Sequence, residues 1–563
     1  MNRKAAAGLA LASTLAIAIA GCTSGSPSPS TGPNTNTVLT EESNTGVTFT
    51  QDFNPFNSSS FATKMNLRSL IYEPLYEFDA LDPAQSHPWL ATAYSFSADG
   101  TSLTFTIRQG VTWNDGKAFT PQDVAFTFKT MKDTQAADYS GVPAQSSDPT
   151  VTGNTVTLHF ASAQFTNLFS IAGSTYIVPQ HIWSSISSPA TAVVTTTIGT
   201  GPYKLKSFST EVAKFGANPS YWGGKLPVSE VDVPYYATND AASSALVAGQ
   251  LDWAGNDIAN IQANYVNLNP TTNHYWFASG NTVTLWFNVG YGALGDAQVR
   301  KAISAGIDRT SLALLGESGY EAPATSSSGL ILPNFKQYLV SSATNDLKST
   351  SDPATVKSLL TADGYTAPTG SGNCTASATA NCFMKNGKII SFNIEDPVPY
   401  SDYWEDAQLI SQQLQAEGID ATTKGDNPDT GWYADYTAGN FQAMIHWGNG
   451  GPTPYVQYQN WLDSTQPVSA GDYGGFKSDA AQQALTTLQG TNPTDTAAIT
   501  TAVQALEQIM ATEAPQVPLL YGADWNVYST SRFTGWPDGS SPYMDPSPND
   551  PELPYILMHL KPV

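Results

Sequence analysis

The sequence predicts an α/β protein with mixed β-sheets, built around more than one hydrophobic core. Segments with the two-residue alternation of half-buried strands are interspersed with segments that have the periodicity of amphipathic helices. About 520 residues follow the N-terminal segment, which is too many for a single core. No internal repeat is visible, and the elements are therefore expected to form two or more lobes.

Two strands and a helix are predicted in the first part of the chain. Residues 102–110 and 154–160 alternate apolar and polar side chains, which is typical of strands with one buried face. Between them, Thr120 as N-cap, Pro121 at the first helical position and Asp123 two residues later predict the start of a helix.

Three further helices are predicted in the second half. The segment 295–308 carries an apolar stripe after Asp296, which can cap the helix. A second helix is expected within 401–422, with Gly418 at its C-terminal end and a strand after it. A third is expected at the start of 505–520.

The first forty residues have the features of a targeting segment and a spacer. A short positive start precedes an apolar run over residues 5–20, which is shorter than the ~20 residues needed to span a bilayer core and is typical of a secretory signal. The run ends in IAGC, which resembles the lipobox of bacterial lipoproteins. The resemblance implies a signal over residues 1–21 and a diacylglycerol group on Cys22; an ordinary signal with an incidental cysteine is the alternative. Residues 22–40 are expected to be a flexible linker.

The charge balance argues against a nucleic-acid partner. The chain has 47 acidic and 24 basic residues, a net charge of −23, and no basic run after Lys4, whereas phosphates require a basic surface. The six histidines are scattered without metal-ligand spacing, so no metal site or cofactor is predicted. No second apolar stretch has membrane-spanning length, so the body is expected to be soluble.

Two cysteines remain besides Cys22. Cys374 and Cys382 lie close together in a segment rich in Gly, Ser, Thr and Asn, and an exported protein meets an oxidising compartment. A disulfide that closes a small surface loop is the prediction. A metal site or a catalytic thiol would need histidine or cysteine partners nearby, and the sequence has none there.

Five stretches, in order, resemble the family 5 extracellular solute-binding proteins, which are the peptide-, nickel- and oligosaccharide-capturing components of ABC importers. These stretches are residues 70–129, 199–205, 218–233, 299–309 and 514–529. They span nearly the whole body of the chain, from about residue 48 to residue 537. The resemblance therefore covers both halves of the protein rather than one motif.

The resemblance implies a two-lobed periplasmic-binding-protein-like fold of type II, in the large class with an extra subdomain. Lobe I is expected over residues 41–286 plus 523–563, with the extra subdomain at 84–198, and lobe II over 287–522. The ligand would be enclosed in a cleft between the lobes when they close. A monomer tethered by lipid to the outer face of the membrane, with ABC permease subunits as partners, is also implied.

The loop after Trp447 bears on the ligand. Peptide binders of the family usually place an Asp after a Trp in the second lobe, where it pairs with the ligand's N-terminal amine. Here Gly448, Asn449, Gly450 and Gly451 follow, with no carboxylate before Asp463. A neutral amide suits hydroxyl groups better than an ammonium group, so the loop favours a sugar.

Aromatic side chains support the same interpretation, because sugars pack their apolar faces on flat rings. The chain has 13 Trp and 26 Tyr, and the DWAGN, HYWF and GPTPY segments resemble the cellobiose-type and related β-oligosaccharide binders. The candidate ligand-binding residues are Trp253, Asn256, Trp276, Trp404, Trp447, Asn449, Tyr455, Tyr458 and Trp461. Aromatic residues are also common in cores, and Trp286, in an alternating strand, is predicted to be one of these.

The leading prediction is thus capture of an oligosaccharide, with an oligopeptide as the alternative; sparse histidines argue against nickel. The rival class is a secreted glycoside hydrolase, which would use two carboxylates. Glu405 and Asp406 are adjacent on a predicted helix and point to different faces, while Asp396 and Asp463 are far apart in sequence. No catalytic residue is predicted. A purely structural surface protein fits poorly with a ligand-capturing fold.

Overall fold

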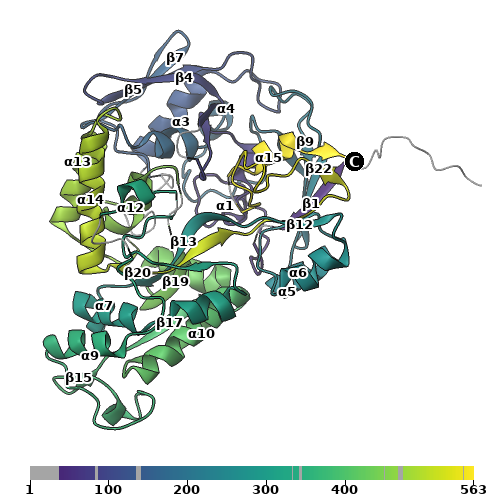
Figure 1. Cartoon of the computed structure of the whole chain (residues 1–563). Helices are drawn as coiled ribbons and strands as arrows, with labels where there is room; N and C mark the ends of the chain where they lie inside the picture. Colours follow the sequence, from purple (N-terminus) through teal and green to yellow (C-terminus); the bar gives the residue numbers. More distant parts are fainter. Residues whose placement is uncertain are drawn as a thin grey trace, which may run out of the picture. The chain divides into compact units, whose positions relative to one another are not determined.

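Two mixed β-sheets with flanking helices form the two lobes of the chain (Figure 1). The computed structural model describes residues 37–42, 44–82, 86–134, 141–332, 334–340, 345–448, 451–466, 473–549 and 551–563. The predicted signal segment, Cys22 and the linker as far as residue 36 lie outside the described residues. Within the described ranges, no helix is both long enough and apolar enough to cross a bilayer.

The first lobe is built on a seven-stranded sheet in the order β12-β21-β11-β1-β10-β9-β8. The strands are β1 (Val38–Glu42), β8 (Tyr203–Phe208), β9 (Val212–Ala217), β10 (Glu230–Pro234), β11 (Trp253–Ala254), β12 (Asn273–Tyr275) and β21 (Val527–Ser529). The central strand β1 runs parallel to β10 and β11, and the other pairs are antiparallel. Its helices are α1 (Phe61–Lys64), α2 (Arg68–Ile71), α5 (Asn239–Val247), α6 (Ile261–Asn264) and α15 (Leu553–His559).

The position of β1 corrects the expected end of the linker. Residues as far as 40 were expected to be a flexible spacer, but the strand begins at Val38. Leu39 is completely buried in the first core, and the backbone N–H of Thr40 donates to Oδ2 of Asp252 at 2.8 Å. The sequence signal for this strand is the apolar pair Val38-Leu39 at the end of a polar tract. Two residues are too few to show a periodicity.

A four-stranded antiparallel sheet packs on the same core as the first lobe. It contains β4 (Ala91–Phe96), β5 (Ser102–Ile107), β6 (Thr150–Thr152) and β7 (Thr155–His159), with α3 (Pro121–Asp133) and α4 (Gln180–Trp183) beside it. The predicted capping of α3 is confirmed, because Oδ2 of Asp123 accepts a hydrogen bond from the backbone N–H of Thr120 at 2.8 Å. Two small hairpins pair β2 (Tyr76–Phe78) with β3 (Ser86–Pro88) and β22 (Phe533–Thr534) with β23 (Lys561–Pro562).

The second lobe is built on a six-stranded sheet in the order β14-β20-β13-β19-β17-β18. Its strands are β13 (Ala278–Phe287), β14 (Ala322–Pro323), β17 (Ser391–Pro397), β18 (Asp420–Asp426), β19 (Ala443–Trp447) and β20 (Gln516–Asp524). The longer helices are α7 (Ala297–Gly306), α9 (Pro353–Ala362), α10 (Ser401–Ala416), α11 (Tyr433–Ala438), α12 (Pro454–Leu462), α13 (Asp479–Gly490) and α14 (Thr496–Glu513). Strand β17 is parallel to both β18 and β19, so the sheet is mixed as predicted.

Local predictions in this lobe agree with the structure. The side chain of Asp296 caps α7 by accepting from the backbone N–H of Gln298. Gly418 follows α10 with a φ of +88°, a left-handed conformation that favours glycine at a helix end. The predicted disulfide between Cys374 and Cys382 is present. It closes a loop beside the short hairpin of β15 (Met384–Lys385) and β16 (Lys388–Ile389).

A single antiparallel ribbon joins the two lobes. Strands β12 and β21 pair in the first sheet, the N–H of Trp276 donates to the carbonyl of Asn526 at 3.0 Å, and β13 and β20 continue the pairing into the second sheet. The chain therefore leaves the first sheet after Tyr275, about ten residues before the expected boundary at 286/287. That expected boundary falls inside β13, whose Leu285 and Phe287 are buried in the second core.

We expect Leu39→Ala to lower the free energy of unfolding by about 2–5 kcal/mol, because it removes a fully buried side chain and leaves a cavity. Urea unfolding of a chain that begins at Thr37 measures the loss. Leu268→Ala is the matched control, since Leu268 is 59% exposed and should change stability by no more than about 0.5 kcal/mol. Equal effects of the two substitutions would contradict the placement of β1 in the core.

Candidate ligand-binding cleft

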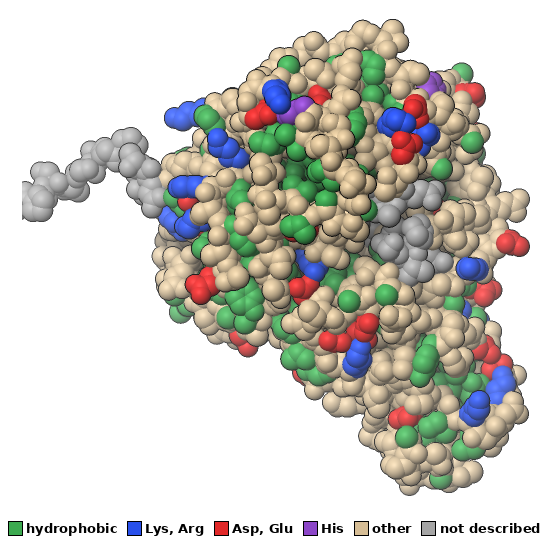
Figure 2. All heavy atoms as spheres, turned by 180° about the vertical axis from the view of Figure 1, so that it is seen from behind, with side chains coloured by type: hydrophobic (Ala, Val, Ile, Leu, Met, Phe, Trp, Pro, Cys, Tyr) green, Lys and Arg blue, Asp and Glu red, His purple; other side chains and the backbone are tan. Residues whose placement is uncertain are grey.

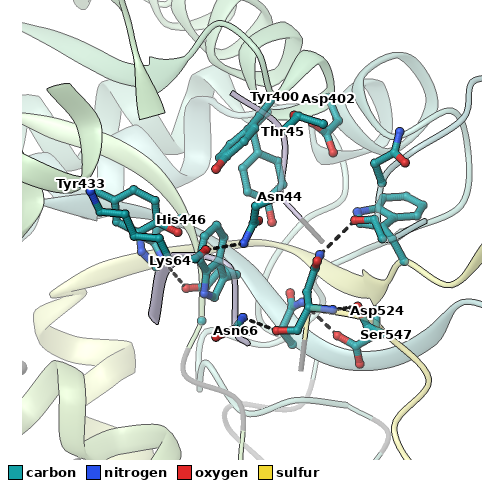
Figure 3. A pocket seen from close by; sticks show the side chains of 18 of the residues that line it. Asn44, Thr45, Lys64, Asn66, Tyr400, Asp402, Tyr433, His446, Asp524 and Ser547 are labelled. Atoms are coloured by element: carbon teal, nitrogen blue, oxygen red, sulfur yellow. Dashed lines mark hydrogen bonds between the residues drawn. The ribbon is translucent and has the colours of Figure 1, made fainter. Parts of the chain in front are cut away.

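A cavity of about 330 Å³ lies where the two lobes meet the ribbon (Figure 3). Its lining comes from the end of β1, from α1, from β13 and β20, from the start of α10 and from β19. A second cavity of about 350 Å³ adjoins it and shares with it Asn281, Trp447, Gly448, Asn460, Tyr473 and Asp524. Both volumes are in the range of small-molecule sites, so the two cavities form one candidate cleft.

Stacked aromatic rings form part of the cavity wall. The ring centroid of Trp286 lies 4.2 Å from that of His446 and 5.1 Å from that of Tyr473, with interplanar angles of 13° and 14°. The fully buried ring of Trp432 stacks on the other face of His446 at 4.8 Å. Strand pairing explains the contact: Trp286 pairs with Met444, so His446 is its diagonal neighbour on the same face.

His446 is held neutral in this stack. Burial lowers its pKa to about 3, because a charged imidazolium ring loses its hydration there. Its Nδ1 lies 2.6 Å from the carbonyl oxygen of Trp447 and donates to it, which leaves Nε2 as an acceptor. Nε2 of His446 and Nε1 of Trp286 are buried without a hydrogen-bond partner within the described part of the chain.

Seven asparagines contribute to the lining of the first cavity. They are Asn44, Asn66, Asn239, Asn256, Asn281, Asn460 and Asn549. Nδ2 of Asn256 donates to the carbonyl of Asn239 at 3.1 Å and to Oγ of Ser243 at 3.0 Å, while its Oδ1 is buried with no partner among the described residues. Such amides offer both donors and acceptors without charge, a combination that suits hydroxyl groups.

Charged groups in the first cavity are mostly acidic. Glu42, Asp402 and Asp524 line it, and Lys64 is the only lysine or arginine among its described lining residues. The ammonium group of Lys64, at the end of α1, forms an ion pair with Asp429 in the turn Pro428–Trp432 of the second lobe. Figure 3 shows Lys64 near His446, with Tyr400 and Asp402 grouped elsewhere on the wall.

Two of the predicted ligand-binding residues, Asn256 and Trp447, line the cavity. Trp276 and Trp404 do not: both are half-buried, Trp276 next to Gly539 and Trp404 next to Gly425. Asn449 lies outside the described residues.

The other four predicted residues are buried in the lobes. Trp253 is completely buried, and its Nε1 donates to Oδ1 of Asn526 at 2.8 Å. Tyr458 is also completely buried, and its hydroxyl donates to the carbonyl of Ser328 at 3.0 Å. Tyr455 and Trp461 belong to the core of the second lobe, at 3% and 7% exposure. The rings of these four residues pack inside the lobes, and none of them lines the cavity.

The sequence did not single out the ribbon residues that form the floor of the cleft. Asn281, Asp524 and Trp525 line the cavity, and Trp286, which was expected to be core, lines it while being only 6% exposed. The available signal was the position of the two crossing segments, because the segments that cross between lobes must lie at the base of the cleft between them.

A group of buried carboxyls lies behind the cavity wall at the start of α10. Glu317, Glu321, Asp396 and Asp406 are each at least 94% buried, and no described lysine or arginine forms an ion pair with them. Burial raises the pKa of all four well above the ordinary range, and neighbouring carboxyls raise it further.

Two solved structures of ligand-bound transport proteins have this architecture. A mannohexaose-bound periplasmic oligopeptide-binding protein of an ABC transporter from Thermotoga maritima superposes with a TM-score of 0.83 at 22% identity, covering 94% of this chain and 99% of that one. The oligopeptide-binding protein AppA of Bacillus subtilis, in complex with a nonapeptide, gives a TM-score of 0.77 at 18% identity over 94% and 100%. These likenesses show that the chain has the two-lobed fold of periplasmic binding proteins.

Sequence comparison identifies the family. Residues 85–469 match the bacterial extracellular solute-binding proteins, family 5 Middle. The nickel-binding periplasmic protein of Escherichia coli is 25% identical over 431 residues, 73% of this chain and 75% of that protein. Protein XP55 of Streptomyces lividans is 31% identical over 237 residues, 40% of this chain and only 41% of that protein. The chain belongs to the family 5 bacterial extracellular solute-binding proteins.

The buried carboxyls predict that the protein is more stable in mild acid than in mild base. A folded-state pKa raised above the unfolded value means that the folded state binds more protons, so stability falls as the pH rises from the unfolded pKa to the folded one. We expect the midpoint of thermal unfolding to be higher at about pH 5.5 than at about pH 8, by about 2 °C or more.

Two substitutions on α10 distinguish the effect of a buried carboxyl on the pH dependence of stability from the effect of net charge. Asp406→Asn replaces a buried carboxyl by a neutral amide and should flatten the pH dependence, whereas Glu405→Gln, at an exposed position one residue earlier, should not. Identical pH profiles for the two variants would show that the buried group is not the cause.

Proposed function

We propose that the chain is the substrate-binding component of an ABC importer and that its cleft captures an oligosaccharide, of a β-linked type. The observation that supports this ligand is the lining of the cavity. The half-buried rings of Trp447 and Tyr473 offer surfaces for the apolar faces of sugar rings. The asparagines offer neutral groups for hydroxyls.

The cellular setting is part of the same proposal. Lipid attached to Cys22 would tether a monomer to the outer face of the membrane, and the linker would let the body reach its permease. The lobes close on the captured sugar and deliver it without chemical change, as in hinge-bending binding proteins generally.

An oligopeptide is the second candidate ligand. The observation that favours it is the pair of cavity-lining carboxylates Glu42 and Asp402, since a buried N-terminal ammonium needs a carboxylate partner. The loop after Trp447 lacks a carboxylate among its described residues up to Leu462, which favours the sugar.

Closure is proposed to depend on the ion pair between Lys64 and Asp429. The two side chains belong to different lobes and are each 12% exposed, so water screens their attraction only partly. Nearby, Gly46 of the first lobe packs against Pro399 and Pro428 of the second, at 3.1–3.2 Å from the position of a Cβ. The pair therefore acts as a latch where the lobes touch.

We expect Trp447→Ala to weaken oligosaccharide binding about tenfold, because it removes a half-buried ring from the wall shared by both cavities. Thermal-shift and calorimetric titration with β-linked di- to pentasaccharides measure the affinity, using a chain that begins at Thr37. Trp404→Ala is the matched control, since Trp404 is also half-buried but lies outside the cavity. Binding of a mixed short-peptide pool, with no response to any sugar, would replace the first candidate by the second.

We expect Asp429→Asn to weaken binding of the same ligand by about three- to tenfold, mainly through faster release, because the closed state loses its latch. Stopped-flow measurement of ligand dissociation separates release from association. Asp148→Asn, which breaks an exposed ion pair with Lys129 far from the cleft, should leave both rates unchanged. Unchanged release in Asp429→Asn would contradict the latch.

A further inference from the structure

The second cavity has walls of its own. One wall comes from the segment 164–174, which follows the four-stranded sheet in the chain and contributes Phe169 and Ser174. The facing wall comes from α12 of the second lobe, which contributes Val456. The side chains of Phe169 and Val456 both lie close to the position of a Cβ at Gly451, at 3.7 Å and 2.7 Å, so the two walls meet there. None of these residues lines the first cavity.

Hydrogen bonds attach the segment 164–174 to the second lobe. The backbone N–H of Phe165 donates to the carbonyl of Gln489, on α13, at 3.2 Å. Nε2 of Gln489 donates to Oε1 of Gln164 at 2.7 Å and to the hydroxyl of Tyr455, on α12, at 3.2 Å. The two walls of the second cavity are therefore joined to each other by direct hydrogen bonds, although they lie far apart in sequence.

Four half-buried side chains lie where the two cavities adjoin. Asn281, Trp447, Asn460 and Tyr473 line both cavities, and part of each side chain is exposed. Two flat rings and two neutral amides therefore border the passage from one cavity to the other. A ligand that crosses this passage contacts the same kinds of group that the first cavity offers to a sugar.

The side chains that the second cavity exposes are neutral. Its charged lining residues are each at least 91% buried, and they are Arg68, Asp524, Asp545 and Glu552. The ring of Phe169 and the side chain of Ser174 are half-buried, as are the four side chains at the passage. A ligand part that enters this cavity therefore meets an aromatic ring and uncharged polar groups.

We infer that the ligand extends through both cavities, and that the captured oligosaccharide is a neutral, linear chain longer than a disaccharide whose far end contacts Phe169. The inference rests on the proposed capture of an oligosaccharide and adds the length and charge of that ligand. Each cavity alone, at about 330 and 350 Å³, is near the lower limit for a small-molecule site. One cavity therefore holds a short piece of the chain, and both together hold a longer one.

The affinity gained in the second cavity has a physical source. A sugar unit there covers the half-buried ring of Phe169 and displaces water from it. Because hydrogen bonds already join the walls, binding there orders few additional protein groups. The affinity is therefore expected to increase with chain length until the second cavity is filled.

Two series of neutral sugars test the inference. They are the β-1,4-linked di-, tri- and tetrasaccharides of glucose and of N-acetylglucosamine, titrated by calorimetry into a chain that begins at Thr37. In the series that binds, the tetrasaccharide should bind about tenfold tighter than the disaccharide. Equal affinities of the disaccharide and the tetrasaccharide would overturn the inference and leave the proposed function standing.

Variants of the second cavity locate the effect. Phe169→Ala removes the ring and Ser174→Phe fills the cavity, and each should bring the tetrasaccharide to within about threefold of the disaccharide. The affinity for the disaccharide should not change. Phe126→Ala is the matched control, because Phe126 is also half-buried but lines neither cavity. Thermal unfolding of each variant verifies that it folds.

Two results with these variants would overturn the inference. A length preference that persists in both Phe169→Ala and Ser174→Phe would show that the second cavity is not its source. A disaccharide affinity that falls as much as the tetrasaccharide affinity would place the whole ligand in the second cavity rather than across the two.

Peptides distinguish the extended site from the nature of its ligand. Di-alanine and tetra-alanine are titrated alongside the sugars. If only peptides bind, and Ser174→Phe removes an advantage of the tetrapeptide over the dipeptide, the two-cavity site stands and the oligosaccharide proposal fails. If only peptides bind and their length has no effect, or if no sugar and no peptide binds, both proposals fail.

Discussion

The antiparallel ribbon formed by residues 273–287 and 516–529 is the constraint on which the cleft depends. It pairs β12 with β21 in one sheet and β13 with β20 in the other, so it fixes both lobes to one backbone ladder. Glycine at two positions of this ladder leaves room for polar side chains of the facing strand. A Cβ at Gly280 would lie 1.3 Å from Oδ2 of Asp524, and one at Gly522 would lie 1.9 Å from Oδ1 of Asn281. The floor of the cavity therefore exists because these two positions have no side chain.

The register of the same ribbon also sets the aromatic wall. Because β13 pairs on its other edge with β19, Trp286 and His446 are held as diagonal neighbours, and Trp432 and Tyr473 extend the stack on either side. A one-residue shift in the pairing register of β13 would move Trp286 to the opposite face of the sheet and break the stack. On the face of the molecule that Figure 2 shows, acidic and basic side chains are interspersed. The stacked aromatic part of the cavity wall is thus created by backbone pairing.

Local structure could be predicted from the sequence, whereas the composition of the cleft could be predicted only in part. The cap of α3 at Thr120 and the glycine after α10 at Gly418 depend on residues a few positions away, which a sequence pattern contains. Trp253 and Trp447 looked alike, since a polar loop with glycine follows each. Only the structure shows that Nε1 of Trp253 donates to Asn526, which is 273 residues away in sequence, and that the ring of Trp253 is completely buried. Trp286 belongs to a core of the second lobe, as its alternating strand predicted, and the structure adds that it also lines the cavity.

The unsatisfied groups of the cavity and the pH dependence of stability have one physical origin. The polar groups of Glu42, Tyr400 and Nε2 of His446 have lost their hydration without gaining a hydrogen-bond partner among the described residues, and each such loss costs free energy. Protonation lowers that cost for the carboxyls, which is why mild acid should stabilise the empty protein.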